Sequence, residues 1–161
     1  MPDGFTHILL GLIAVELLSL KYDWATDYRS IVLIGAMLPD LGNFKLIAGE
    51  FGAHELYYVF LPFHSIIGAL LLITLFTLIF KKKYWRKIFP LLSIGVFTHL
   101  FGDYLIKVLD GYLPLFFPFT FERFGFQIFI SAGRGFIIVA SVTLAILIIN
   151  RRRKIKEVVE V

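Results

Sequence analysis

The sequence contains no cysteine, which excludes disulfide bonds and thiolate ligands for a metal ion. Any metal must therefore be held by histidine, aspartate, glutamate, asparagine or backbone oxygen, and this donor set favours zinc, manganese or another borderline to hard cation. Charged residues are also scarce, and residues 1–4 include no lysine or arginine. The first apolar run therefore lacks the basic region that begins a cleaved secretory signal, and we expect it to belong to the native structure.

Hydrophobic residues, in contrast, make up 58% of the 161 residues and form apolar runs along nearly the whole chain. A soluble domain of this size needs far less apolar sequence for its core, so the composition indicates a chain surrounded by lipid. At about 20 residues per span, the length allows about five transmembrane helices and no separate soluble domain. We therefore predict an all-α integral membrane protein, with residues 1–161 forming a single polytopic membrane domain. Its basic residues cluster in short loops, which gives no reason to expect a nucleic-acid partner.

The apolar runs predict spans at residues 5–20, 30–40, 57–80, 88–108 and 135–150. The stretch 112–131 is rich in phenylalanine and contains two prolines, a pattern too broken for a regular spanning helix. Its aromatic residues favour an element that lies in the membrane interface or re-enters the bilayer.

Ionisable side chains interrupt the fourth run at regular intervals. His99, Asp103 and Lys107 follow one another at steps of four residues and share one face if the run is helical throughout. An Asp or Lys at the centre of a membrane helix costs about 2.5 to 3.5 kcal/mol, so three ionisable groups on one stripe require a compensating role. Imidazole and carboxylate one turn apart can bind the same cation. The alternative is a hydrogen-bonded polar seam between packed helices.

The distribution of basic residues predicts the orientation of the spans. The clusters 81–87 and 151–154 lie one pair of spans apart, so both are cytoplasmic if five helices cross, with the N-terminus outside. Of the 16 basic residues, those then left outside are Lys45, Lys107, Arg123 and Arg134. Five potential ligands from four spans reach the outer layer on this topology: His7, Asp40, His64, His99 and Asp103. This convergence predicts one metal site that opens to the outside.

The same stretches carry a family resemblance. Its most specific parts are Pro39-Asp40, the His-x-x-x-Asp of 99–103 and the Pro-Phe-Thr segment that ends in Arg-Phe-Gly-Phe at 126, beside Thr6-His7 and Phe63-His64-Ser65. Over most of its length the chain resembles the predicted membrane-bound metal-dependent hydrolases of the LexA-regulated inner-membrane type, which are bacterial or archaeal. That family is distantly similar to zinc-dependent phospholipase C and P1-type nuclease folds. The resemblance implies a phosphoesterase-like centre with the five residues above as its metal ligands.

Two positions depart from the family pattern. Gly42 stands where members commonly have a second aspartate, and Val59 stands where they commonly have a second histidine. These departures favour one fully held ion over a multi-metal centre, with Asn43 or His54 as auxiliary ligands.

We therefore expect a membrane-embedded hydrolase that uses metal-activated water on a phospholipid or another amphiphilic phosphate ester. Zinc is the first expectation for the divalent metal and manganese the second. Asp40 or Asp103 would accept a proton during catalysis. The phosphate would be held by Arg123, with Lys107 and Arg134 as alternatives and Asn43 beside them.

The alternative function is a non-enzymatic membrane protein that uses the same residues as a metal-ion or proton pathway, or as a structural seam. A transport path needs polar groups on both sides of the membrane midplane, whereas the inner halves of the spans offer chiefly Glu16. We expect Glu16 to reach the inner interface or to pair with a neighbouring helix.

Overall fold

The computed structural model describes residues 4–42, 61–107, 114–120, 122, 129–130 and 134–159. In these ranges it has five α-helices: α1 (Gly4–Ser19), α2 (Arg29–Met37), α5 (Ile66–Leu78), α6 (Trp85–Leu105) and α7 (Arg134–Val159). Four 3-10 helices accompany them: η1 (Asp23–Tyr28), η2 (Pro39–Gly42), η3 (Leu61–His64) and η4 (Lys82–Tyr84). The described part is thus mostly helical, with a turn at 115–119 and a ladder between two short strands, β1 (Ile106–Lys107) and β2 (Phe129–Ile130).

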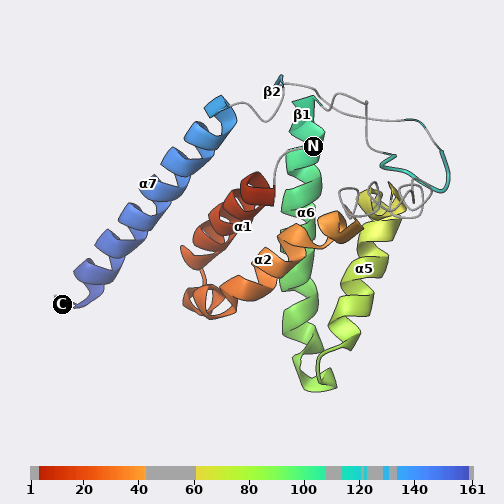
Figure 1. Ribbon diagram of the computed structural model, residues 1–161. Coiled ribbons are helices and arrows are strands. Elements are labelled where there is room, and N and C mark those ends of the chain that lie inside the picture. Colours follow the sequence, from red (N-terminus) through yellow and green to blue (C-terminus); the bar gives the residue numbers. More distant parts are fainter. Residues whose placement is uncertain are drawn as a thin grey trace.

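Helix α6 is the centre of the bundle, and α1, α2 and α5 all pack against it (Figure 1). Helix α7 packs against α1 at the periphery. The start of α1 and the strand β1 lie at one end of the bundle, which we call the upper end. The turns that join α1 to α2 and α5 to α6 lie at the opposite, lower end.

Helices α2 and α6 meet backbone to backbone at Gly35 and Gly95. A Cβ atom added to Gly35 would lie 2.5 Å from the carbonyl oxygen of Leu92, and one added to Gly95 would collide with the backbone of Val32 and Ala36. Small residues permit such close approach between membrane helices. Because the two backbones touch, a side chain one turn further along α6 can reach a carbonyl group of α2.

Apolar side chains fill the space on both sides of this glycine contact. One buried cluster joins α2, α5 and α6 and consists of Leu38, Ala69, Ile73, Ile88, Leu92, Val96 and Leu100. A smaller one joins α1, α2 and α6 and consists of Val15, Val32 and Leu91. In lipid, such packing stabilises helix association through van der Waals contact rather than through the hydrophobic effect. The two clusters fix the four helices relative to one another.

The observed helices follow the predicted spans in order but differ in length. The first prediction, 5–20, agrees closely with α1, whereas α2 ends at Met37, ahead of Pro39. The prediction of a third span from residue 57 was wrong for 61–65, because α5 begins only after Ser65. The Ser65 hydroxyl caps this helix by accepting a 3.0 Å hydrogen bond from the Gly68 amide. Residues 57–60 lie outside the described ranges.

One helical stretch in the described ranges is long and apolar enough to cross a membrane, the 24 residues Lys82–Leu105. The apolar helices Gly4–Ser19, Ile66–Leu78 and Ile137–Arg151 are shorter. At 1.5 Å per residue the 16 residues of α1 extend about 24 Å and the 13 residues of α5 about 20 Å, against a hydrocarbon core of about 30 Å. Of the five or so full-length transmembrane helices expected, the described residues thus contain one that meets the length, and the other apolar helices are shorter.

The strand ladder pairs Ile106 with Phe129 and Lys107 with Ile130 in parallel. The chain between these strands therefore starts and finishes at the upper end of α6 (Figure 1). Within it, the carbonyl oxygen of Leu115 accepts a 3.0 Å hydrogen bond from the amide of Ile66, at the start of α5. Most of the residues in 112–131 lie outside the described ranges, so the interfacial or re-entrant placement of this stretch stays a prediction.

Candidate metal centre

The structure brings together the five side chains that the sequence predicts as metal ligands. His7 comes from the first turns of α1, Asp40 from η2, His64 from the end of η3, and His99 and Asp103 from the upper half of α6. The side chains of His7 and His99 are fully buried, that of Asp103 is 1% exposed and that of His64 is 6% exposed. Asp40 is the most accessible of the five, at 11%.

Each imidazole faces both carboxylates through its Nε2 atom. His7 Nε2 lies 3.8 Å from Asp40 Oδ2 and 3.5 Å from Asp103 Oδ1. His64 Nε2 lies 3.6 Å from Asp40 Oδ1 and 3.8 Å from Asp103 Oδ2. His99 Nε2 lies 3.7 Å from Asp40 Oδ1 and 3.2 Å from Asp103 Oδ2. Three nitrogen donors and two carboxylates therefore surround one small volume.

These contacts are too long or too poorly aligned to be hydrogen bonds. Within the described residues, the Nε2 atoms of His7, His64 and His99 and both carboxylate oxygens of Asp103 have no hydrogen-bond partner. A buried polar atom without a partner costs about 1 to 3 kcal/mol, and such atoms are rare in folded proteins. Several of them directed at one point indicate a site built for a ligand.

The tautomer of His99 follows from its second ring nitrogen. His99 Nδ1 lies 2.8 Å from the carbonyl oxygen of Ala36. Because a carbonyl oxygen can only accept, Nδ1 must carry the proton, and in the neutral ring Nε2 then presents a lone pair to the carboxylates. A lone pair facing carboxylate oxygens is repulsive unless a cation lies between them. Histidines that bind metals commonly donate their other N–H group to a backbone carbonyl in this way.

The spacing of the donor atoms suits a single metal ion. With metal–ligand bonds of about 2.1 Å, donor atoms 3.2 to 3.8 Å apart subtend angles of about 100° to 130° at a common centre, which four- and five-coordinate zinc sites use. Two ligand groups can be drawn, His7–His99–Asp103 and Asp40–His64–His99, and they share His99. The charges also balance, because two carboxylates and three neutral imidazoles neutralise one divalent cation in a buried site.

The histidine rings are packed closely as well. The ring centroids of His7 and His99 are 3.7 Å apart with an interplanar angle of 20°, and His64 lies with its centroid 5.6 Å from that of His99. Two stacked imidazolium ions at this distance would repel each other strongly in a buried site. Neutral imidazoles, the form that binds metals, can adopt this stacked arrangement without such repulsion.

Glu16 lies apart from this centre, in the lower half of α1. Its carboxylate is 3% exposed and accepts a 2.6 Å hydrogen bond from Arg29 Nη2 at the start of α2. Arg151 Nη1 of α7 lies 3.4 Å from the other carboxylate oxygen. The expected pairing of Glu16 with a neighbouring helix is confirmed, and the pairing joins three helices at the lower end.

The residues predicted to hold the phosphate are described only in part. Asn43 and Arg123 lie outside the described residues, as does the auxiliary candidate His54. Lys107 lies in β1 and Arg134 begins α7, both at the upper end of the bundle (Figure 1). The prediction that Lys107 shares a helical face with His99 and Asp103 was wrong, because α6 ends at Leu105 and the next two residues pair with β2.

Sequence reasoning missed the carbonyl group of Ala36, which orients His99. A backbone acceptor carries no residue signature. The signal that was present is the pair of small residues Gly35 and Ala36 directly ahead of the Pro39-Asp40 motif, together with Gly95 one turn before His99.

Comparison with known proteins agrees with the lipid-facing composition. No curated protein and no solved structure matches the chain. The model of a family described as YdjM inner membrane protein matches residues 1–160. This family description agrees with the long apolar helix at Lys82–Leu105 and indicates a location in the bacterial inner membrane. The chain belongs to the YdjM inner membrane protein family.

Proposed function

We propose that this protein is a metal-dependent hydrolase that cleaves a phosphate ester of a membrane lipid or another amphiphile. The observation that carries the proposal is the set of three imidazole Nε2 atoms that face the carboxylates of Asp40 and Asp103, with no hydrogen-bond partner among the described residues for these nitrogens or for the Asp103 oxygens. Nitrogen and oxygen donors of this kind suit a divalent zinc ion, with manganese second. The motif resemblance to membrane-bound metal-dependent hydrolases supports the same class of chemistry.

His7, Asp40, His64, His99 and Asp103 would hold the cation. When bound, such an ion polarises a phosphoryl oxygen and lowers the pKa of bound water. The hydrogen bond from His99 Nδ1 to the Ala36 carbonyl keeps Nε2 of this ring directed at the centre. Burial of the site by α1, α2 and α6 limits access of bulk water, which strengthens every electrostatic interaction there.

Asp40 is the better placed of the two carboxylates to handle a proton. Its side chain is 11% exposed, whereas that of Asp103 is 1% exposed, so water and substrate reach the site past Asp40. In the hydrolysis, the oxygen of water bonds to phosphorus and the P–O ester bond breaks. The proton lost by water passes to Asp40 and from there to the departing alkoxide.

Lys107 and Arg134 support the binding of an anionic substrate at the same end. Both are cations at the upper end of the bundle, where the predicted topology disfavours them. Together with Arg123 and Asn43 they are our candidates for holding the phosphate. The aromatic turn at 115–119 contacts the start of α5 near His64, so the site adjoins an element suited to the membrane interface.

Metal analysis of the protein purified in detergent tests the proposal. We expect about one zinc or manganese ion per chain, and release of phosphate or a phosphorylated headgroup from lipid phosphate esters. The variants His99→Ala and Asp103→Asn should lose the metal, with at least about a 100-fold fall in affinity, and should lose hydrolysis with it. Glu16→Gln, which changes a buried carboxylate at the other end of α1, is the matched control and should keep both.

Stoichiometric metal in both ligand variants would show that the ligand assignment is wrong. If the two ligand variants lose the metal but the wild type hydrolyses no lipid phosphate, the result would instead favour the pathway alternative. That alternative has little support on α1, because residues 8–15 between His7 and Glu16 are all apolar or glycine and Glu16 is already bound by two arginines. A zinc or proton flux into proteoliposomes that disappears in His64→Ala would be its signature.

A further inference from the structure

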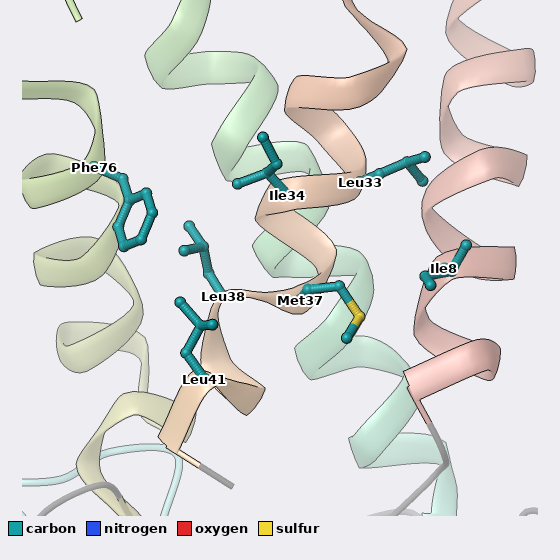
Figure 2. A pocket seen from close by; sticks show the side chains of 7 residues that line it. All are labelled: Ile8, Leu33, Ile34, Met37, Leu38, Leu41 and Phe76. Carbon is teal, nitrogen blue, oxygen red and sulfur yellow. The ribbon is translucent and has the colours of Figure 1, made fainter. Parts of the chain in front are cut away.

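The outer face of α2 carries an apolar groove beside the candidate metal centre (Figure 2). Helix α2 and the residues that follow it form the floor, with Ile8 of α1 as one wall and Phe76 of α5 as the other. The groove has a volume of about 590 Å³ and is lined by Ile8, Leu33, Ile34, Met37, Leu38, Leu41 and Phe76. All seven lining residues are apolar, and the volume falls within the range of about 300 to 1,000 Å³ usual for small-molecule sites.

Three residues that line the groove are close in sequence to candidate ligands of the metal centre. Leu38 and Leu41 lie on either side of Asp40 in sequence, and Ile8 follows His7. Asp40 is also the most exposed of the five candidate ligands. From Leu33 to Leu41 the floor extends about 12 to 14 Å, at about 1.5 Å per residue in α2 and about 2.0 Å per residue in η2. A molecule lying along this floor would therefore have one end beside the turn that carries Asp40.

The chemistry around the groove indicates which kind of molecule would bind in it. In a membrane protein, an apolar groove on an outer helix face is in contact with lipid, and leaving it empty would forfeit the dispersion contacts of its lining. Among the described residues, the polar cluster closest in sequence to the lining is the centre proposed above to bind a phosphate ester. A lipid phosphate has the matching arrangement, because its apolar chain is followed by an anionic group.

We propose that the groove on α2 binds one acyl chain of the lipid substrate and thereby places its phosphate next to Asp40. The substrate is then a long-chain lipid phosphate, and the protein selects it by its chain as well as by its headgroup. This inference rests on the proposed hydrolase function for its kinetic test, and a second test below is independent of activity.

The kinetic test fills the groove with a larger side chain. Ile34 is 43% exposed and extends from α2 into the groove (Figure 2), so Ile34→Trp would occupy the space of the chain. We expect kcat/KM for dipalmitoyl phosphatidic acid to fall about tenfold or more, since several methylene groups lose their contacts. Hydrolysis of dibutyryl phosphatidic acid should change by less than about twofold, because its short chains need little of the groove. Ile146→Trp, at a position on α7 that is 52% exposed, is the matched control and should behave like the wild type toward both lipids.

An equal loss with both lipids, or no loss with the long-chain lipid, would overturn the inference. If the wild type hydrolyses neither lipid, native mass spectrometry in detergent decides the question. Wild type and Ile146→Trp should then retain dipalmitoyl phosphatidic acid in preference to the dibutyryl form, and Ile34→Trp should not. Equal retention by all three proteins would overturn the groove assignment, whereas selective retention without hydrolysis would count against the hydrolase alone.

Discussion

His99 makes several different contacts in the candidate centre, and together they fix the position of its ring. It belongs to both possible ligand groups, stacks on His7 and donates its Nδ1 proton to Ala36. Its Nε2 atom lies 3.2 Å from Asp103, one turn further along the same helix. The local spacing of four residues thus supplies two ligands, and the close approach of α2 fixes the tautomer of one of them.

The buried carboxylates give a prediction about stability. Without a cation, the buried carboxylate of Asp103 has no hydrogen-bond partner among the described residues, and an uncompensated buried charge costs about 3 to 5 kcal/mol. We expect a metal chelator to lower the melting temperature of the wild-type protein in detergent. The drop should be much smaller in Asp103→Asn, which carries one charge fewer and holds metal poorly from the start. Differential scanning fluorimetry with and without chelator measures both.

Glu16→Gln serves as the control for this experiment, because it removes a buried carboxylate without touching the centre. It should show the same chelator-induced drop as the wild type. A drop of equal size in Asp103→Asn would mean that chelation acts somewhere other than this site.

At the level of elements, the short helix α2 governs the geometry of the site. It lies against α6 through Gly35 and Gly95, and it ends ahead of Pro39, so that Asp40 falls in a 3-10 turn rather than on a helix face. A continuous helix would have carried residue 40 past the centre, because successive residues rotate by about 100°. The ending of α2 also leaves its outer face open as the apolar groove.

The glycine contact can be tested without changing any ligand. In Gly95→Val, the added side chain would collide with the backbone of Val32 and Ala36 and push α2 away from α6. We expect a loss of stability of about 3 kcal/mol or more, since the clash is with backbone rather than with movable side chains. Metal affinity should fall as well, because Ala36 moves away from His99. Both are measurable on protein in detergent, by thermal unfolding and by metal titration.

Phe97→Leu provides the comparison on the same helix, since Phe97 is 46% exposed and faces away from α2. It should leave metal binding unchanged. Unchanged metal affinity in a folded Gly95→Val protein would contradict the link between the helix contact and the site.

For the whole molecule, the important feature is the separation of two polar clusters at opposite ends of an apolar bundle. The five-residue metal centre lies at the upper end, and the Glu16–Arg29–Arg151 cluster lies at the lower end. Lys87 also packs over the ring of Tyr28 there, with 5.4 Å from Nζ to the ring centroid. The basic stretches 81–87 and 151–154 thus share the lower end with these contacts (Figure 1), as the charge distribution predicts.

This arrangement predicts which side of the membrane the site faces. The native chain has no cysteine, so single cysteines report accessibility directly. We expect Thr120→Cys, at the upper end, to react with a membrane-impermeant maleimide added to intact cells. Lys83→Cys and Lys154→Cys, at the lower end, should react only after permeabilisation. The reverse pattern would place the centre on the cytoplasmic face, and labelling of Thr120 and Lys83 from one side would contradict the bundle's topology.

The ligand residues were predictable because a buried ionisable group in lipid is expensive and therefore rare without a reason. His7, Asp40 and His64 stand out in apolar runs on that ground alone, and the order of the spans brings them to one end. The structure was needed to show that these side chains lie within a few ångströms of one another. Whether they bind a metal stays a prediction.

Other features depend on contacts between distant parts of the chain and could not be predicted. The end of α6 at Leu105 is set by a strand partner more than twenty residues away, and the start of α5 is set by the cap at Ser65. The groove likewise arises from three helices at once. Hydrophobic periodicity reports which residues avoid water, and in lipid nearly all of them do, so it gives little information on helix ends.

The ladder between β1 and β2 has a consequence for how this family can diversify. Since the chain leaves and returns at adjacent points on top of α6, a change in the length of the intervening stretch need not displace the end of α6. Natural variation in this family should therefore include differences in the length of this stretch outside the motif at 118–126, while the length of α6 changes little. The same architecture would let a protein engineer exchange this stretch between family members while keeping α6 unaltered.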